Sequence, residues 1–326
     1  MLDELLPYYE NELTYLRRLS REFAARYPKI AARLQMDGEV CEDPHVERII
    51  ESFAFLTARI HKKLDDEFPQ ITEALLSVLY PHFLRPVPSM SVVQLQLAPG
   101  AEITAMQELP RHSLLLSRPV QGLPVRYRTG YPVEVWPIRI ADARLEAAER
   151  SAFALTQGDT VATLRLRLES AGALPLSKLP LRRLRLYLDG ESPLVHALHE
   201  LLLNSATGLT LRAPDDQPQV PPLRLPASAL RPVGFEEDEG LLDYDPRSFL
   251  GYRLLQEYFV LPEKFLFVDI DGTDTGRFGQ ALEIAVEIGA FGRPERLARL
   301  EQAVGADTFR LFCTPVVNLF KQQAEP

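Results

Sequence analysis

The sequence predicts an α+β fold with a helical N-terminal bundle or arm, a β-rich middle region and a mixed α/β C-terminal region. Apolar residues recur every three or four positions through residues 1–90, which is the spacing of an amphipathic helix. After Met90 they recur at every second position, which is the period of a β-strand. Six prolines between Pro214 and Pro232 exclude a continuous helix or a central strand there. The expected domains are 1–90, 91–232 with the proline-rich segment as its final connector, and 233–326.

The composition is that of a folded globular protein, with 46% hydrophobic and 25% charged residues among 326. No apolar run approaches the ~18 residues that a membrane helix needs, and the acidic N-terminal segment differs from a basic signal peptide. Cys41 and Cys313 are too few for a disulfide framework or a cysteine metal cage. The net charge of −9 opposes nucleic-acid binding. We therefore expect no nucleic-acid partner and no direct membrane insertion.

The helical region is expected to contain three main helices. The first ends before Pro28, and Asp43-Pro44 is a typical start for the second, because the aspartate can cap backbone N–H groups and the proline fits the first turn. The second helix is expected to end at Phe68-Pro69. Its apolar stripe comprises Val46, Ile49, Phe53, Leu56, Ile60 and Leu64. The apolar side chains of the third helix that are expected to face inward are Ile71, Leu75, Val78 and Leu79. An aspartate in the stripe of the second helix should then unfold the arm.

The first helix carries apolar side chains on more than one face. One stripe comprises Leu5, Tyr9, Leu13 and Leu16. Tyr8 and Tyr15 share another face, whereas a monomeric amphipathic helix buries one face. An equally weighted alternative is that each tyrosine packs its ring on its own domain and exposes its hydroxyl. The candidate interface residues of this helix are Leu5, Tyr8, Tyr9, Leu13 and Leu16.

Acidic residues gather where the second helix is expected to end. Asp65 and Asp66 would be unfavourable at a helix C-terminus, so Lys62, Lys63 or an arginine of a partner should compensate them. Paired carboxylates can also share a metal ion or a proton. Adjacent helical residues point in different directions, which favours a structural or interface role. Asp65 and Asp66 are therefore candidate interface residues.

The middle and C-terminal regions alternate strands with short helices. In TLRLRL the leucines face one side, while Arg165 and Arg167 share the outer face and are candidate interface anchors. Short helices are expected to begin at Ser192 and Ser248. Strands are expected at SVVQLQL, YPVEVWPIRI, TLRLRLES, LRLYLDG, FLFVDI, ALEIAVEIG and TFRLFCTPVVNLF, with a helix at PERLARLEQAV.

Catalytic signals are weak throughout the sequence. His196 and His199 stand three apart but lack a third metal ligand in register, and DIDGTDTGRFG departs from a calcium-binding EF-hand loop. G-x-S-x-G and C-x-x-C motifs are absent from the sequence. We expect no catalytic residue, no cofactor and no metal. The alternative is a carboxylate-dependent hydrolase or carbohydrate-acting enzyme on the β-rich region, which a pocket with two carboxylates of perturbed pKa would support.

Several long segments resemble the TssF family (also called ImpG or VasA) of baseplate subunits in bacterial type VI secretion systems. The resemblance is weakest across 100–230. Family members are considerably longer than this chain, so we expect the C-terminal domain to be cut short. The segments that carry the resemblance are PYYENELTYLRRLSREFAARYPKIAARL, DPHVERIIESFAFLTARIHKKLDDEFPQITEALLSVLYPHFLRPVPSM, YRLLQEYFVLPEKFLFVDI and FRLFCTPVVNLFKQQAEP.

The resemblance implies a structural scaffold without catalytic residues. TssF resembles the wedge proteins of contractile phage-tail baseplates and pairs with TssG, generally two TssF per TssG. The wedges surround a spike hub and initiate the sheath and the tail tube. The implied partners are TssG, a second copy of TssF, TssK, TssE and the spike hub. The implied location is the bacterial cytoplasm, in a membrane-docked baseplate.

Overall fold

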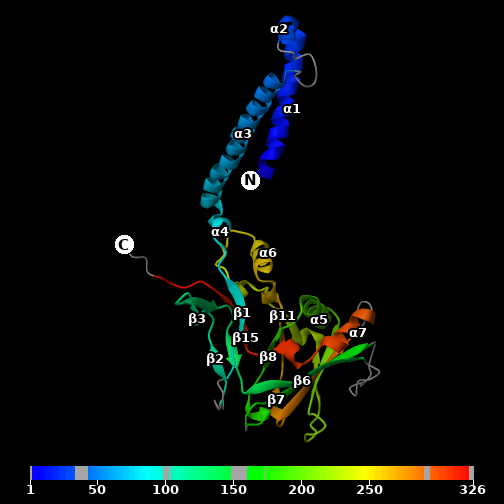
Figure 1. Cartoon of the computed structure of the whole chain (residues 1–326). Coiled ribbons are helices and arrows are strands. Elements are labelled where there is room, and N and C mark those ends of the chain that lie inside the picture. Colours follow the sequence, from blue (N-terminus) through cyan, green and yellow to red (C-terminus); the bar gives the residue numbers. More distant parts are fainter. Residues whose placement is uncertain are drawn as a thin grey trace. The chain divides into compact units, whose positions relative to one another are not determined.

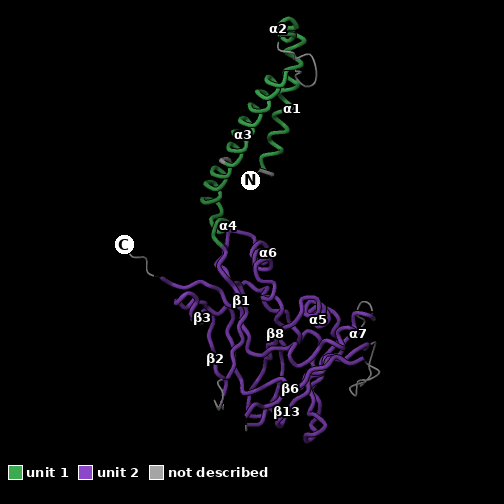
Figure 2. The backbone as a smooth tube through the Cα atoms, viewed as in Figure 1, with its two compact units in different colours: residues 1–86 green, residues 87–326 purple. Residues whose placement is uncertain are grey.

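The computed structural model describes residues 2–33, 43–97, 103, 105–147, 160–172, 174–289 and 294–322. The chain forms two compact units, which Figure 2 distinguishes by colour. Unit 1 comprises residues 1–86 and is helical, and unit 2 comprises residues 87–326 and is rich in strands. The predicted α+β class with a helical N-terminal region is confirmed. None of the helices in the described part of the chain combines the length and the apolar character that a membrane crossing requires.

Unit 1 is built around two long antiparallel helices (Figure 1). Its helices are α1 (Leu2–Arg26), α2 (Pro28–Arg33), α3 (Pro44–Leu79) and α4 (Pro81–Leu84). Arg17 of α1 pairs with Glu47 of α3 at 2.6 Å, and Glu12 lies 2.8 Å from His61. The side chain of Asp43 accepts a hydrogen bond from the backbone N–H of His45 at 2.8 Å, as predicted for the cap of α3.

The predicted end of the second helix at Phe68-Pro69 is wrong. The single helix α3 continues through Pro69 to Leu79. A proline inside a helix removes one backbone donor, and the segment after it contains three leucines, Glu73 and Ala74, all good helix formers. The helix ends instead just before Pro81, at a point where the residue preceding a proline is pushed out of helical geometry.

Unit 2 contains three larger sheets and a small two-stranded one among the described residues. The five-stranded sheet has the order β10-β9-β13-β7-β6, and the four-stranded sheets have the orders β11-β12-β8-β14 and β1-β15-β4-β3. The strands are β1 (Met90–Gln94), β2 (Gln107–Leu109), β3 (Leu114–Val120), β4 (Leu123–Thr129), β5 (Val133–Val135), β6 (Ile138–Ala147), β7 (Ala162–Ser170), β8 (Arg183–Leu188), β9 (Ala206–Arg212), β10 (Leu223–Pro226), β11 (Leu230–Val233), β12 (Phe267–Asp271), β13 (Ala281–Ile288), β14 (Phe309–Arg310) and β15 (Cys313–Val317). Every neighbouring pair within these sheets is antiparallel.

The structure differs from the expected domain boundary at residue 232. β13 lies between β9 and β7, β12 lies between β11 and β8, and β15 lies between β1 and β4. Strands from 233–326 therefore complete the sheets begun by 91–232, and both segments belong to unit 2. The proline-rich segment contributes β10 and β11, each at the edge of its sheet. Edge strands tolerate proline because one side of the strand needs no backbone donor.

The core of unit 2 joins two of its sheets through helix α5 (Ser192–Asn204). This helix contacts β9 and β13 of the five-stranded sheet and β8 and β11 of the adjacent sheet. Helix α7 (Pro294–Ala303) lies beside α5 and contacts β6 (Figure 1). The leucines of β7 point into this core as predicted, and Leu166 is 1% exposed. Between α5 and α7 in the chain, helix α6 (Leu250–Val260) is amphipathic and follows the acidic loop at 236–239.

Candidate interaction surfaces

A long row of exposed apolar side chains in unit 1 forms a stripe along α3. Ile49 is 67% exposed and Phe53 is 59% exposed. The buried contact with α1 is made instead by the small side chains of Ala54 and Ala58, both 0% exposed. We call the exposed set the α3 stripe, and it comprises Ile49, Phe53, Leu56, Ile60, Leu64, Ile71, Leu75 and Val78. The expectation that the third predicted helix directs its apolar residues inward is therefore wrong. The exposure of the stripe also argues against the expectation that an aspartate in it would unfold the arm.

The predicted interface residues of α1 lie partly against α3. Leu5, Tyr8, Tyr9, Leu13 and Leu16 are all half-buried. The hydroxyl of Tyr8 forms a hydrogen bond with Asp65 of α3, and this bond raises the pKa of Tyr8. A second set of α1 side chains is exposed, namely Leu6, Tyr15, Leu19 and Phe23. Helix α1 therefore has one apolar face toward α3 and further apolar side chains facing solvent.

Asp65 and Asp66 lie within α3 rather than at its end. The unfavourable interaction with a helix C-terminus that the sequence predicts is therefore absent, because the carbonyl groups around them are bonded within the helix. Lys62 compensates one of them as expected, since its Nζ donates to Asp66 at 3.0 Å. Both aspartates are exposed.

Arg165 and Arg167 lie on the outer face of the five-stranded sheet, where carboxylates of the same unit neutralise them. Arg165 donates to Glu283 at 2.9 Å, and Arg167 donates to Asp216 at 2.8 Å. The bond with Asp216 raises the pKa of Arg167 and lowers that of Asp216. Arg212 also donates to Glu283, at 3.0 Å. These arginines therefore stabilise the sheet, and a partner would compete with existing ion pairs to bind them.

A buried polar network holds helix α6 against the rest of unit 2, and the sequence analysis missed it. Glu257 and Lys264 form an ion pair in which both side chains are 0% exposed. Glu257 also accepts from the backbone N–H groups of Leu241 and Leu242, at 2.7 and 3.0 Å. Lys264 donates to the carbonyl of Gly234 at 2.8 Å. Burial lowers the pKa of Lys264, and the charge of Glu257 opposes that shift.

Arg253 completes this network from the same face of α6. Its guanidinium donates to the carbonyls of Glu236 and Glu237 at 2.9 and 2.8 Å, and so holds the backbone of the acidic loop. The side chains of Glu236, Glu237 and Asp238 remain exposed. The acidic loop is therefore anchored through its backbone, while these three side chains face solvent.

The opposite side of α6 is apolar and borders a pocket of about 300 Å³. The pocket is lined by His196, His199, Phe235, Leu254, Leu255, Tyr258, Pro262, Phe265 and Leu266. Outside it, Phe259 is 81% exposed, and Phe249 and Tyr252 are also exposed. The spacing of about one turn between Phe249, Tyr252, Leu255 and Phe259 is the signal for this surface in the sequence. We call the pocket, together with Tyr252 and Phe259, the α6 surface.

The two histidines of α5 lie in the wall of this pocket. Burial lowers the pKa of His199, and its hydrogen bond to the backbone of Phe265 partly opposes that shift. In the described ranges no group of three or more histidine, cysteine, aspartate or glutamate side chains could hold a metal ion.

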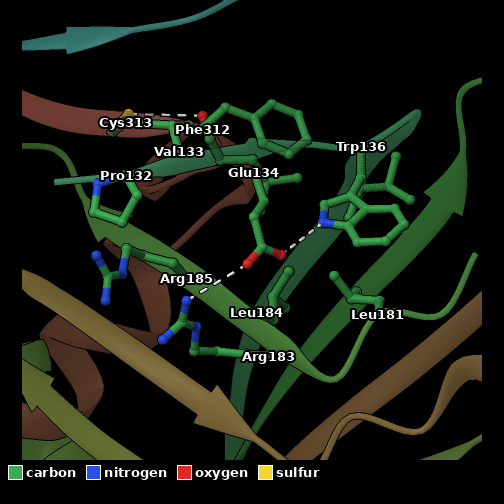
Figure 3. A pocket seen from close by; sticks show the side chains of 12 residues that line it. Pro132, Val133, Glu134, Trp136, Leu181, Arg183, Leu184, Arg185, Phe312 and Cys313 are labelled. Atoms are coloured by element: carbon green, nitrogen blue, oxygen red, sulfur yellow. Dashed lines mark hydrogen bonds and ion pairs between the residues drawn. The ribbon is translucent and has the colours of Figure 1, made fainter. Parts of the chain in front are cut away.

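The enclosed pocket in Figure 3 bears on the enzyme alternative. Its volume is about 40 Å³, well below the roughly 300 Å³ of a typical small-molecule site. Glu134 is the carboxylate that lines it, accepting from the indole N–H of Trp136 at 3.3 Å and lying 3.6 Å from Arg183. A second pocket of about 290 Å³ has the carboxylate of Asp307 in its lining. Each of these two pockets is lined by a single carboxylate and not by the pair that would support the hydrolase alternative.

Comparisons with known proteins agree on one family. The model of the family described as "Type VI secretion system, TssF" matches residues 1–326. The type VI secretion system component TssF1 of Pseudomonas aeruginosa is 41% identical over 334 residues, which cover 100% of this chain and 53% of that protein. A chain in the solved TssK-TssF-TssG baseplate subcomplex is 30% identical, with a TM-score of 0.64 over 86% of this chain and 50% of that one.

This chain spans about half the length of both relatives. The match of the family model nevertheless extends over all of its residues, and the similarity to the solved chain includes the fold as well as the sequence. The chain therefore belongs to the TssF family of the type VI secretion system.

Proposed function

We propose that this chain is a structural scaffold of the baseplate wedge of a type VI secretion system, and that its helical unit binds TssG. The similarity to a chain of the TssK-TssF-TssG subcomplex supports TssG and TssK as partners. A second copy of TssF, TssE and the spike hub complete the proposed set of neighbours. The proposed location is the bacterial cytoplasm, at a baseplate docked on the membrane. The proposal assigns the chain no reaction.

The α3 stripe is the observation that carries this proposal. From Ile49 to Val78 it extends about 44 Å at 1.5 Å per residue. Its members are separated mostly by three or four positions, the spacing with which one helix packs against another. Continuous exposed apolar surfaces of more than a few hundred Å² mark interaction sites on soluble proteins. A helix of TssG that carries its own apolar stripe would fit this surface.

The structure supports the other candidate interface residues to different degrees. Leu5, Tyr8, Tyr9, Leu13 and Leu16 would support the stripe from α1, since each keeps part of its surface exposed. Asp65 and Asp66 are exposed on α3 and would orient a basic side chain of the partner. Arg165 and Arg167 would act in a separate contact. They are weaker candidates, because a partner would have to compete with their existing ion pairs.

Co-purification with TssG tests the proposal. The full chain and TssG are expressed together, and the mass of the purified complex gives the stoichiometry. We expect a stable complex, and we expect the triple variant Phe53→Asp, Leu56→Asp, Ile60→Asp to lose it, because each aspartate would be desolvated without a partner.

The matched control is Arg59→Asp, which places an aspartate at an exposed position of the same helix outside the stripe. It should retain TssG. Absence of a complex with the unmodified chain would contradict the scaffold proposal. A complex that survives the triple variant would place the TssG interface elsewhere and remove the α3 stripe from the proposal.

A further inference from the structure

The α6 surface is a preformed hollow rather than a flat patch. Leu254, Leu255 and Tyr258 form its wall on α6, while Phe265 and Leu266 follow that helix in the chain. Phe265 lies between two other rings, with centroid distances of 5.0 Å to Phe235 and 5.9 Å to Tyr258. A volume of about 300 Å³ accommodates one large side chain with its neighbours.

Buried polar contacts hold the wall of this hollow in place. Arg253 and Glu257 are on the face of α6 that points into the unit. Arg253 donates to the backbone of the acidic loop, and Glu257 pairs with Lys264 and accepts from the backbone N–H groups after that loop. Each of the three charged side chains is at most 4% exposed. A helix fixed in this way needs little ordering when a ligand enters, so less of the interaction free energy is lost on binding.

The exposed charged side chains next to the lining of the hollow in the sequence are acidic. Among the described residues within two positions of its lining, the exposed charged side chains are Glu200, Glu236, Glu237 and Glu263. Glu200 lies 3.5 Å from Arg296, which offsets part of its charge. The lowered pKa of His199 leaves that side chain neutral at pH 7. The hollow therefore presents an apolar interior inside an acidic rim.

We propose that the α6 surface binds a segment of a partner protein in which one large aromatic or aliphatic side chain is flanked by lysine or arginine. The large side chain fills the hollow, and the flanking cations pair with Glu236, Glu237 and Glu263. Phe259 and Tyr252 extend the apolar contact on one side. The acidic rim disfavours nucleic acids and anionic lipid headgroups, which carry the same sign of charge.

This site lies in unit 2 and does not depend on the α3 stripe of unit 1. Loss of binding at the α6 surface would leave the TssG proposal unaffected. Loss of TssG binding would in turn leave the α6 inference unaffected, because peptide binding measures it separately.

Fluorescence anisotropy with synthetic peptides tests the inference on the full chain. The probe is a fluorescein-labelled heptapeptide with a central tryptophan, an alanine on each side and two lysines at each end. One control peptide replaces the tryptophan by alanine, and the other replaces the lysines by glutamate. We expect both control peptides to bind at least about tenfold more weakly, and we expect salt to weaken the binding of the probe.

Variants locate the bound peptide. Tyr258→Ala and Leu255→Gln change exposed residues that line the hollow. Each should weaken the binding of the probe peptide by about tenfold. Phe249→Ala removes an exposed aromatic ring that precedes α6 and lies outside the lining of the hollow, and it should leave binding within about twofold. Glu236→Gln combined with Glu237→Gln should reduce the salt dependence. Thermal unfolding followed by the fluorescence of Trp136 verifies that each variant is folded.

Three outcomes would overturn the inference. The first is absence of binding to the folded chain at millimolar peptide. The second is that the lysine and glutamate peptides bind equally well, or that Phe249→Ala and Tyr258→Ala weaken the binding of the probe peptide equally. The third is self-association of the chain in analytical ultracentrifugation that Tyr258→Ala abolishes, because the hollow would then accommodate a second copy instead of a basic partner segment.

Discussion

Unit 1 keeps many of its largest apolar side chains on the surface, whereas unit 2 buries nearly every leucine of its central strands. In unit 1, Ala54 and Ala58 make the close contact between α3 and α1, and Ile49 and Phe53 face solvent. In unit 2, the leucines of β7 are enclosed between a sheet and helices. Small side chains let two helices approach closely, but they bury little apolar area.

This difference implies that unit 2 is stabilised by contacts within the chain, whereas unit 1 depends more on contacts with a partner. A fully buried Leu, Ile or Phe side chain contributes roughly 1.5–3 kcal/mol relative to an exposed one. Unit 2 already has this contribution within one chain. Unit 1 would gain much of it only when another molecule covers the α3 stripe. Substitutions of equal chemical severity should therefore have opposite consequences in the two units.

The largest effect on stability is expected from Lys264→Met in unit 2. It would leave the fully buried carboxylate of Glu257 without its cationic partner, at a cost of about 3–5 kcal/mol in the free energy of unfolding. Urea unfolding followed by the fluorescence of Trp136, the single tryptophan, measures this change. The double variant Glu257→Gln, Lys264→Met should recover part of the loss. A change below about 1 kcal/mol for Lys264→Met would mean that the pair is not buried in solution.

The next effect is expected at the contact between α1 and α3. Ala58→Leu adds three carbon atoms where the side chain is 0% exposed, and overpacking of this kind costs about 1–3 kcal/mol. Circular dichroism at 222 nm during thermal unfolding follows the loss of helix, and Arg59→Leu is the matched control at an exposed neighbouring position. If both variants melt alike, the alanines do not form the contact, and the comparison between the units fails.

Sequence periodicity predicted which residues share a face, but not which face is covered. The alternation in TLRLRL placed the leucines of β7 correctly, because a strand in a sheet has two faces and the apolar one is buried. Helix α3 presents side chains in all directions around its axis, and its large apolar residues gave a clearer periodic pattern than its small ones. The buried Ala54 and Ala58 are small and gave almost no such pattern. The reading of the stripe as the inner face therefore failed in unit 1.

Long-range pairing was also beyond the reach of a single sequence. Arg165 looked available on its strand, but Glu283, which accepts its hydrogen bond, is 118 positions away on β13. The pairing became visible once β13 was found beside β7. Similarly, the ion pair of Glu257 and Lys264 joins a helix to the turn after it, and no motif marks two such residues as partners. The Asp43 cap was predictable because its partner is two residues away.

A smaller effect is expected from acid through His199. Burial lowers the folded-state pKa of this histidine below its unfolded value of about 6.5, so the unfolded state binds the proton more readily. The associated stability is present above pH 6.5 and is lost as the pH falls below that value. Urea unfolding of unit 2, followed by Trp136 fluorescence at pH 8 and pH 5.5, should show this loss. His199→Asn should show less of it, and equal pH dependence in both proteins would contradict the assignment.

The smallest effect on stability, and the sharpest contrast with Lys264→Met, is expected from Ile49→Asp. The side chain is 67% exposed, so the aspartate remains hydrated, and exposed substitutions change the free energy of unfolding by no more than about 0.5 kcal/mol. Circular dichroism should show an unchanged melting transition for the isolated chain. The same substitution should weaken the complex with TssG, because the charge must then lose its water. A variant that unfolds the helical unit on its own would show that the α3 stripe is already covered within the chain, and the distinction between the two units would disappear.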